Sequence, residues 1–178
     1  PSISFPENHD TPRLSARSRS LLGVQKQRYV FASFFSAALQ VTMGYEFCWQ
    51  KACHSTRTTV RDQEDRTLDI SGFIRECNRF SDNWPPMQEE GRITAGNSYW
   101  ESVLFLEKNT MAGDGTLIVN KNWNHSQPVR LSGNGWMCRP FLETSAWSWE
   151  PLAEELILEP AECVLIRRDD PPKQWRKI

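Results

Sequence analysis

The chain has 178 residues, of which 39% are hydrophobic and 24% charged, and this composition excludes a chain that is disordered throughout. Its length suits one domain or two small ones, at about 100–150 residues each. With 21 basic and 22 acidic residues the net charge is −1, so we do not expect nucleic acid as a partner.

Four elements are predicted in the first 80 residues. Residues 2–5 alternate polar and apolar and read as a short strand that ends at a proline, and a polar loop follows. Residues 24–39 are apolar on most sides, which predicts a buried helix. Residues 41–47 read as a buried strand, and residues 68–80 restart helical spacing after a long polar loop at 48–66. The sequence therefore predicts two consecutive β/α units.

The apolar stretch at 29–47 is about as long as a membrane span, which needs about 20 apolar residues. It is interrupted by Ser33, Gln40 and Glu46. A buried helix that runs into a buried strand fits this pattern better, so no membrane partner is expected.

The pattern changes after the prolines of residues 82–86, which we take as a domain boundary. Short strand candidates follow at 102–106, 116–119, 127–131 and 163–167, separated by Gly-rich turn signals at 113–115 and 133–135. Short strands punctuated in this way predict an antiparallel β-sandwich. We therefore expect two domains, residues 1–82 and residues 83–178.

The cysteines point to a reducing compartment. There are five cysteines, an odd number, and no two are spaced as C-x-x-C, so a disulfide framework is not expected. We therefore expect a cytoplasmic location. Cys48, Cys53 and His54 lie near one another in the sequence but lack a fourth ligand at a suitable spacing. We expect no metal and no cofactor.

The residues that carry chemistry follow the first strand, in the segment FPENHDTPRL. In a (β/α)8 barrel, catalytic groups lie on the loops at the C-terminal ends of the strands. An adjacent Asn8, His9 and Asp10 offer several directional hydrogen bonds, which suits the hydroxyl groups of a sugar. Taken alone the triplet is also compatible with a polar turn that precedes a helix.

The order of motifs along the chain resembles the end of an enzyme of the α-amylase superfamily, glycoside hydrolase family 13. In that family an Asn-His-Asp-Thr motif follows the seventh barrel strand, and an apolar helix comes next. An eighth strand ending in Gly-Tyr-Glu follows, which Gly44, Tyr45 and Glu46 match. The closing sandwich has a strand motif Leu-x-Pro-x-Glu, which residues 158–162 match. The resemblance implies the last two β/α units of a barrel followed by a C-terminal β-sandwich.

The resemblance also implies roles for individual residues. Asp10 corresponds to the third catalytic carboxylate, which orients sugar hydroxyls, and His9 corresponds to its neighbouring hydroxyl binder. Asn8, Arg13 and Glu46 are implied as further substrate-binding residues. The expected ligand is an α-glucan or maltooligosaccharide.

The nucleophile and the general acid of the family lie on earlier strands, and a barrel needs eight strands and about 250 residues. Retaining glycosidases need both carboxylates, about 5–5.5 Å apart. We therefore expect a C-terminal fragment of a retaining hydrolase or transglycosylase that is inactive in isolation, with the remainder of the barrel as its partner.

A second hypothesis is a carbohydrate-binding module. The chain has eight tryptophans, and exposed indoles stack on sugar faces. Trp147 and Trp149, or Trp123, are candidates for such a platform in the sandwich, with the first 80 residues as an accessory. The competing explanation is that these indoles seal the sandwich against the barrel.

Overall fold

The computed structural model describes residues 2–17, 21–65, 68–97, 101–141 and 146–177. It begins with a β-α-β unit, in which strands β1 (Ile3–Ser4) and β2 (Ala38–Leu39) pair in parallel and helix α1 (Leu21–Phe35) connects them. The ladder ends just after the Gln40 amide donates to the Ser4 carbonyl at 2.9 Å. Pro6, two residues after β1, has no amide hydrogen to continue the pairing.

The predicted strand at 41–47 is wrong. The strand lies earlier, at Ala38–Leu39, and residues Tyr45–Phe47 form the short 3-10 helix η2. Gly44 has a left-handed φ of +85°, and a Cβ atom there would lie 2.0 Å from the Trp49 ring. This residue turns the chain back on itself, which only glycine does without strain. The predicted helix at 24–39 is confirmed but begins three residues earlier and ends four residues earlier.

Helix α2 (Ser71–Ser81) confirms the helix predicted at 68–80. Ile70 is the N-cap residue of α2, and Asp69 Oδ1, just before it, accepts a hydrogen bond from the Ser71 amide at 2.7 Å. Phe80 and Cys77 are buried on the face of α2 that meets the rest of the molecule. Four further 3-10 helices are short: η1 (Leu14–Ala16), η3 (Val60–Asp62), η4 (Pro85–Met87) and η5 (Lys173–Trp175).

The second half contains two antiparallel sheets. The larger has the order β3-β4-β5-β10-β7-β8, and the smaller pairs β6 with β9. The bounds are β3 Arg92–Ala95, β4 Val103–Thr110, β5 Gly113–Asn120, β6 Gln127–Arg130, β7 Trp136–Cys138, β8 Glu150–Pro151, β9 Glu155–Leu158 and β10 Cys163–Arg167. The four predicted strands correspond to β4, β5, β6 and β10, and the other four were not predicted. The turn predicted at 113–115 is the start of β5 instead.

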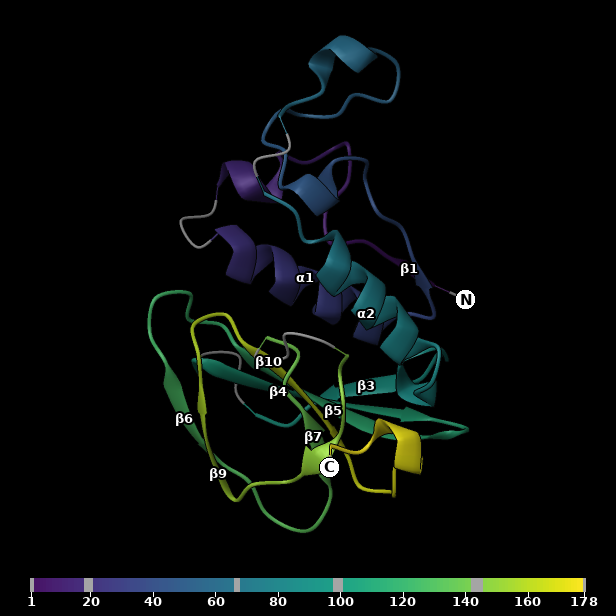
Figure 1. The fold of residues 1–178 in the computed structure, drawn as a ribbon, viewed down its shortest axis with the longest axis vertical. Helices are drawn as coiled ribbons and strands as arrows, with labels where there is room; N and C mark the ends of the chain where they lie inside the picture. Colours follow the sequence, from purple (N-terminus) through teal and green to yellow (C-terminus); the bar gives the residue numbers. More distant parts are fainter. Residues whose placement is uncertain (1, 18–20, 66–67, 98–100, 142–145, 178) are drawn as a thin grey trace.

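The larger sheet buries both of its faces, and the side chains of its central strands alternate between two cores. Along β10, Cys163 and Leu165 face a core shared with the helices, whereas Val164 and Ile166 face a core shared with β6 and β9. Figure 1 shows α1 and α2 as a layer against one side of the large sheet. The fold is thus a partial β/α barrel followed by an antiparallel β-sandwich, as predicted.

One core joins the two halves of the chain. Trp84, beside the predicted boundary, is buried against Phe34 of α1 and Phe80 of α2, with ring centroids 6.1 Å apart in both pairs. It also contacts Trp149, at 5.1 Å. Division into two domains at residues 82 and 83 stays a prediction. In the part of the chain that the structure describes, no helix is long and apolar enough to cross a membrane.

Candidate functional site

The Asn-His-Asp triplet lies in the loop directly after β1, at the carboxyl end of a parallel strand. The Asp10 side chain is 73% exposed and the His9 side chain 46%, and His9 Nε2 lies 3.4 Å from Asp10 Oδ1. The loop is folded back locally, because Asn8 Oδ1 accepts from the Asp10 amide at 3.1 Å. The Thr11 hydroxyl donates to the Asn8 carbonyl at 3.4 Å. The carboxylate and imidazole are therefore adjacent, accessible and available to a ligand.

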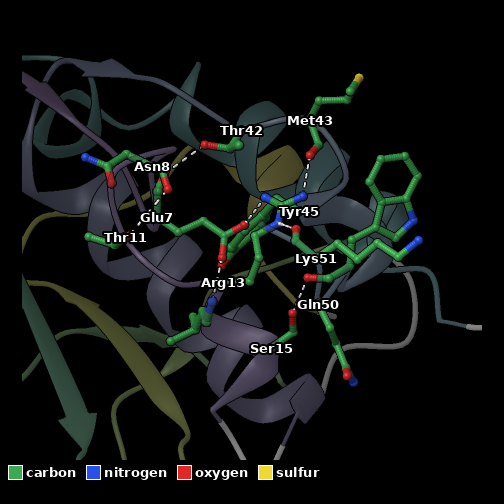
Figure 2. A network of polar contacts seen from close by, with 12 residues as sticks. Glu7, Asn8, Thr11, Arg13, Ser15, Thr42, Met43, Tyr45, Gln50 and Lys51 are labelled. Carbon is green, nitrogen blue, oxygen red and sulfur yellow. Dashed lines mark hydrogen bonds and ion pairs between the residues drawn. The ribbon is translucent and has the colours of Figure 1, made fainter. Parts of the chain in front are cut away.

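A buried ion pair lies beneath this exposed loop. Glu7 and Arg13 are 5% and 1% exposed, and Arg13 NH1 donates to Glu7 Oε1. Glu7 Oε2 accepts from the Leu14 amide at 2.8 Å, so both carboxylate oxygens have a donor. Figure 2 shows this pair at the centre of a network of polar contacts. The ion pair closes residues 7–14 into a loop that carries Asp10 on its outer side.

The same network joins this loop to the loop after β2. Arg13 NH2 donates to the Met43 carbonyl at 2.5 Å, and Arg13 Nε donates to the Lys51 carbonyl at 3.1 Å. In the opposite direction, the Thr42 hydroxyl donates to the Glu7 carbonyl at 3.1 Å. Figure 2 shows Arg13 bonded to Met43 and Lys51 on the second loop, while Thr42 of that loop bonds to Glu7 on the first. The guanidinium thus holds together the loops that follow two neighbouring parallel strands.

One further contact connects the two loops, and two others hold the second loop in place. The Ser15 hydroxyl donates to the Trp49 carbonyl, and the Trp49 amide donates to the Gly44 carbonyl at 3.1 Å. The Tyr45 hydroxyl donates to the carbonyl of Gln25 in α1. The first two bonds satisfy backbone groups of Trp49 and Gly44 in an irregular segment, which would be costly to bury unpaired.

Burial controls the titration of the groups beneath the loop. Burial raises the pKa of the Glu7 carboxyl, while the Leu14 amide bond and the positive charge of Arg13 oppose this shift. Burial raises the pKa of Tyr45 well above its usual value, and it raises that of Cys48 to about 11. At neutral pH the phenol and the thiol are protonated, so neither group is an activated nucleophile.

Arg13 was expected to bind substrate, but in the structure it makes its contacts within the protein. Its side chain is almost fully buried, and its Nε, NH1 and NH2 all donate within the protein. A direct bond to a ligand would require this network to open. Glu46 lies in η2, on the second loop, and its carbonyl accepts from the Ile70 amide at 2.8 Å. Among the described residues, no hydrogen bond or ion pair joins Glu46 to Asp10.

Sequence reasoning missed Glu7, Ser15 and Thr42 as residues that position the loop. Glu7 adjoins the Asn-His-Asp triplet, and an acidic residue six positions before an arginine was the available signal. That signal was weak, because the sequence does not show that both charges are buried or that the arginine reaches a second loop.

The tryptophan platform predicted at Trp147 and Trp149 is wrong. Both indoles are 2% exposed, and they pack against Phe80 with ring centroids 5.6 and 4.9 Å from the Phe80 centroid. They seal the sandwich against α2, which was the competing explanation. Trp123, by contrast, is only half-buried and lines a surface cavity.

The long loop after β2 is closed at its base. Glu64 Oε1 accepts from the amides of Gln50 at 2.8 Å and Lys51 at 2.6 Å. The segment between these points projects from the far end of the molecule and contains η3 (Figure 1). Within the described residues, no group of three or more His, Cys, Asp or Glu side chains is placed to hold a metal ion.

No protein-family model and no curated protein matches the sequence. Solved structures match it in fold. The α-amylase from Geobacillus thermoleovorans in complex with acarbose has a TM-score of 0.63 and 16% identity, and the match covers 94% of this chain and 39% of the amylase chain. The γ-CGTase from alkalophilic Bacillus clarkii has a TM-score of 0.67 and 14% identity, covering 95% and 26%. The trehalose-6-phosphate hydrolase from Bacillus licheniformis has a TM-score of 0.63 and 9% identity, covering 92% and 42%.

The chain spans about two fifths or less of the length of these structures, while they cover almost all of it. At such low identity the likeness establishes the fold. The chain therefore has the fold of part of an α-amylase-superfamily enzyme, which confirms at the level of architecture the resemblance seen in the sequence.

Proposed function

We propose that this chain is the C-terminal part of a retaining α-glucan hydrolase or transglycosylase, and that Asp10 is its substrate-orienting carboxylate. The observation that carries the proposal is the placement of Asp10. The carboxylate is exposed at the carboxyl end of a parallel strand beside His9, on a loop that a buried ion pair fixes. That is the edge at which barrel enzymes hold their catalytic groups.

The chemistry of this role follows from the groups present. An ionised carboxylate accepts hydrogen bonds from two sugar hydroxyls, and the neighbouring His9 imidazole donates or accepts one more. Such bonds accelerate glycoside cleavage only to the extent that they strengthen as the sugar ring approaches the oxocarbenium-like transition state. In this proposal Arg13 is a positioning residue, because it fixes the loop without reaching the ligand, and Asn8 shapes the turn that presents Asp10.

An α-glucan or maltooligosaccharide is the proposed ligand. Among the structures of similar fold, one α-amylase holds acarbose and two AmyP structures hold maltotriose and maltose. Glu46 lies on the second loop and is proposed to contact the same ligand. A cytoplasmic location, without nucleic acid or membrane as partner, belongs to the proposal as well.

The remainder of the barrel is the proposed protein partner. A cavity of about 480 Å³ lies beside β1, with Phe31, Phe35 and Phe5 among its lining residues. Ile3 is 62% exposed, and Phe5 and Phe35 are 47% and 44% exposed. The sheet of β1 and β2 has only two strands in the described part of the chain, so each strand has an open edge. Neighbouring β/α units of a barrel would cover these apolar groups and edges.

The experiment compares hydrolysis of maltooligosaccharide by the isolated chain and by a longer polypeptide that supplies the upstream strands. The isolated chain is expected to be inactive, because two carboxylates of the reaction lie elsewhere. In the longer enzyme, Asp10→Asn is expected to lower kcat/KM by about 100-fold or more, as for other groups that act in the transition state.

Asp114→Asn, an exposed carboxylate in β5, is the matched control and should leave the rate unchanged. Full activity of the Asp10→Asn enzyme would contradict the proposal. So would hydrolysis by the isolated chain that this substitution abolishes.

A further inference from the structure

A second candidate site lies on the sandwich, on the loop between β5 and β6. This loop and residues 101–102, which precede β4, line a cavity of about 450 Å³. Its lining combines one aromatic side chain with hydroxyl, amide and charged groups: Glu101, Ser102, Lys121, Asn122, Trp123 and Asn124. None of these residues belongs to the Asp10 loop or to the loop that follows β2.

The loop that carries Trp123 is held in one conformation by two asparagines. Asn120 is fully buried, and its Nδ2 donates to the carbonyls of His125 at 3.0 Å and Glu159 at 2.9 Å. Asn122 Oδ1 accepts from the amides of Asn124 at 2.9 Å and His125 at 3.0 Å. Trp123 therefore lies in a preformed turn, and little conformational entropy is lost when a ligand binds it.

The base of the same loop is joined to the helical layer. Gln27 of α1 is buried, and its Nε2 donates to the carbonyls of Asn120 at 2.7 Å and Ala161 at 2.9 Å. The Ala161 amide in turn donates to the Asn122 carbonyl at 3.0 Å. The cavity is thus built on the rigid centre of the fold.

The chemistry of the cavity suits a neutral sugar. Trp123 is half-buried, so part of its indole is open to the cavity, and an indole presents an apolar surface to the C–H face of a pyranose ring. Asn124 flanks it with an amide group that both donates and accepts hydrogen bonds, and Asn122, whose Oδ1 is taken by two backbone amides, offers its Nδ2 as a donor. Lys121 and Glu101 contribute opposite charges, so the lining has no net charge that would select a polyanion.

We propose that this cavity is an auxiliary α-glucan-binding site, in which Trp123 stacks on a glucose ring. The choice of an α-glucan as ligand rests on the proposed function; the site itself rests on the preformed turn and its half-buried indole. A site of this kind anchors a polymer at a second point, which raises the local concentration of the chain that enters the catalytic cleft.

The experiment is affinity electrophoresis of the full chain in native gels with and without amylopectin, supported by titration with maltoheptaose. The wild-type chain is expected to be retarded by amylopectin. Trp123→Ala should weaken binding by about tenfold or more, which corresponds to about 1.4 kcal/mol. Trp123→Phe keeps an aromatic face and should retain most of the retardation, which separates loss of stacking from loss of folding.

Trp136→Phe is the matched control. Trp136 is also half-buried on the sandwich, but its Nε1 donates to Asp170 Oδ1 at 3.0 Å, and its ring faces the Arg176 guanidinium at 4.7 Å. This substitution should leave retardation unchanged. Asp114→Asn, at an exposed position of β5 outside both proposed sites, should leave it unchanged too.

Three results would overturn the auxiliary site: no retardation of the wild-type chain, equal retardation of Trp123→Ala, or retardation that Asp10→Asn alone abolishes. The proposed function fails by a different measurement, namely an Asp10→Asn enzyme with full hydrolytic activity.

Discussion

Two regions of this molecule are held together by different physical means. The loops after β1 and β2 meet around the Glu7–Arg13 ion pair, which joins irregular backbone through side-chain hydrogen bonds. The helices and the large sheet meet instead around an aromatic cluster, in which Phe80 contacts Trp84, Trp147, Trp149 and Trp175 with ring centroids 4.9–6.1 Å apart.

The difference follows from what each region has to do. Irregular loops contain many backbone groups without partners in a helix or sheet, and a buried polar network satisfies them while it fixes their direction. In the packed layers the helices and sheets already pair their backbone groups. There the burial of large apolar rings contributes more to the stability of the fold than further polar contacts would. The network is therefore expected to control the geometry of the Asp10 loop, and the cluster to control the stability of the whole fold.

The largest effect is expected from the aromatic cluster. Trp149 is 2% exposed and contacts both Phe80 and Trp84. Trp149→Ala leaves a large cavity and should lower the free energy of unfolding by about 3–5 kcal/mol in denaturant melts. Trp136→Phe, at a half-buried site, should lower the free energy of unfolding much less. Equal losses in the two variants would contradict the central place of the cluster.

Breaking the polar network is expected to act more locally. Arg13→Met leaves the Glu7 carboxylate buried without its partner. It should lower the free energy of unfolding by about 3 kcal/mol. The loss should appear in hydrogen exchange as faster exchange of the Leu14 and Trp49 amides, which bond to Glu7 and Gly44, than of amides in β5 and β10.

A second substitution tests whether the unpaired charge is the cause. Adding Glu7→Gln to Arg13→Met removes the buried charge and should recover part of the lost stability. If Arg13→Met alone speeds hydrogen exchange equally in every element, the expectation that the polar network acts locally is contradicted.

A smaller effect is expected where the cluster meets the sheet. A Cβ atom on Gly115 of β5 would lie 2.7 Å from the Trp84 ring. Gly115→Ala should overpack this contact and destabilise the fold by about 1–3 kcal/mol in thermal or denaturant melts. Gly72→Ala is the control, because it adds a Cβ to α2 with nothing within 4 Å. That variant should be neutral or slightly stabilising.

The smallest effect is expected at Glu90, which ties the start of the chain to the sandwich. Hydrogen bonds from the Ser2 amide and hydroxyl, and from the Ala37 amide, lower the pKa of Glu90 below its usual 4.5. The folded state thus releases this proton more readily than the unfolded state. The stabilisation is fully present above about pH 4.5 and is lost as the pH falls through the lowered pKa.

Relative to wild type, Glu90→Gln should flatten the acid limb of a plot of unfolding midpoint against pH, below about pH 4.5. Glu107→Gln, at an exposed position in β4, should leave the limb unchanged. An identical pH dependence of wild type and Glu90→Gln would show that these bonds do not persist in solution.

Local patterns predicted several elements well and others poorly. Both α1 and α2 and four strands of the sandwich were predicted, because residues that are buried at regular intervals give the sequence a recognisable hydrophobic periodicity. Strands β7 and β8 are only three and two residues long, which is too short for a periodic signal. The predicted strand at 41–47 failed because Gly44 adopts a left-handed conformation that apolar composition does not reveal.

The candidate site shows the same division. The Asn8, His9 and Asp10 triplet was recognised because adjacent polar groups after a strand are visible in the sequence. The roles of Glu7 and Arg13 were not, since a buried ion pair depends on contacts with residues 42–51, which are distant in the chain. The sequence likewise left open whether Trp147 and Trp149 form an exposed platform or seal the sandwich, and the structure shows that they are buried.

The sequence by itself determined the order of the β/α segment and the sandwich, the presence of a carboxylate after the first strand, and the family resemblance. These depend on residue type and spacing over short stretches. Only the tertiary structure decided which charges are buried, which indoles are covered and which loops meet, because burial is a property of segments that come together from distant positions.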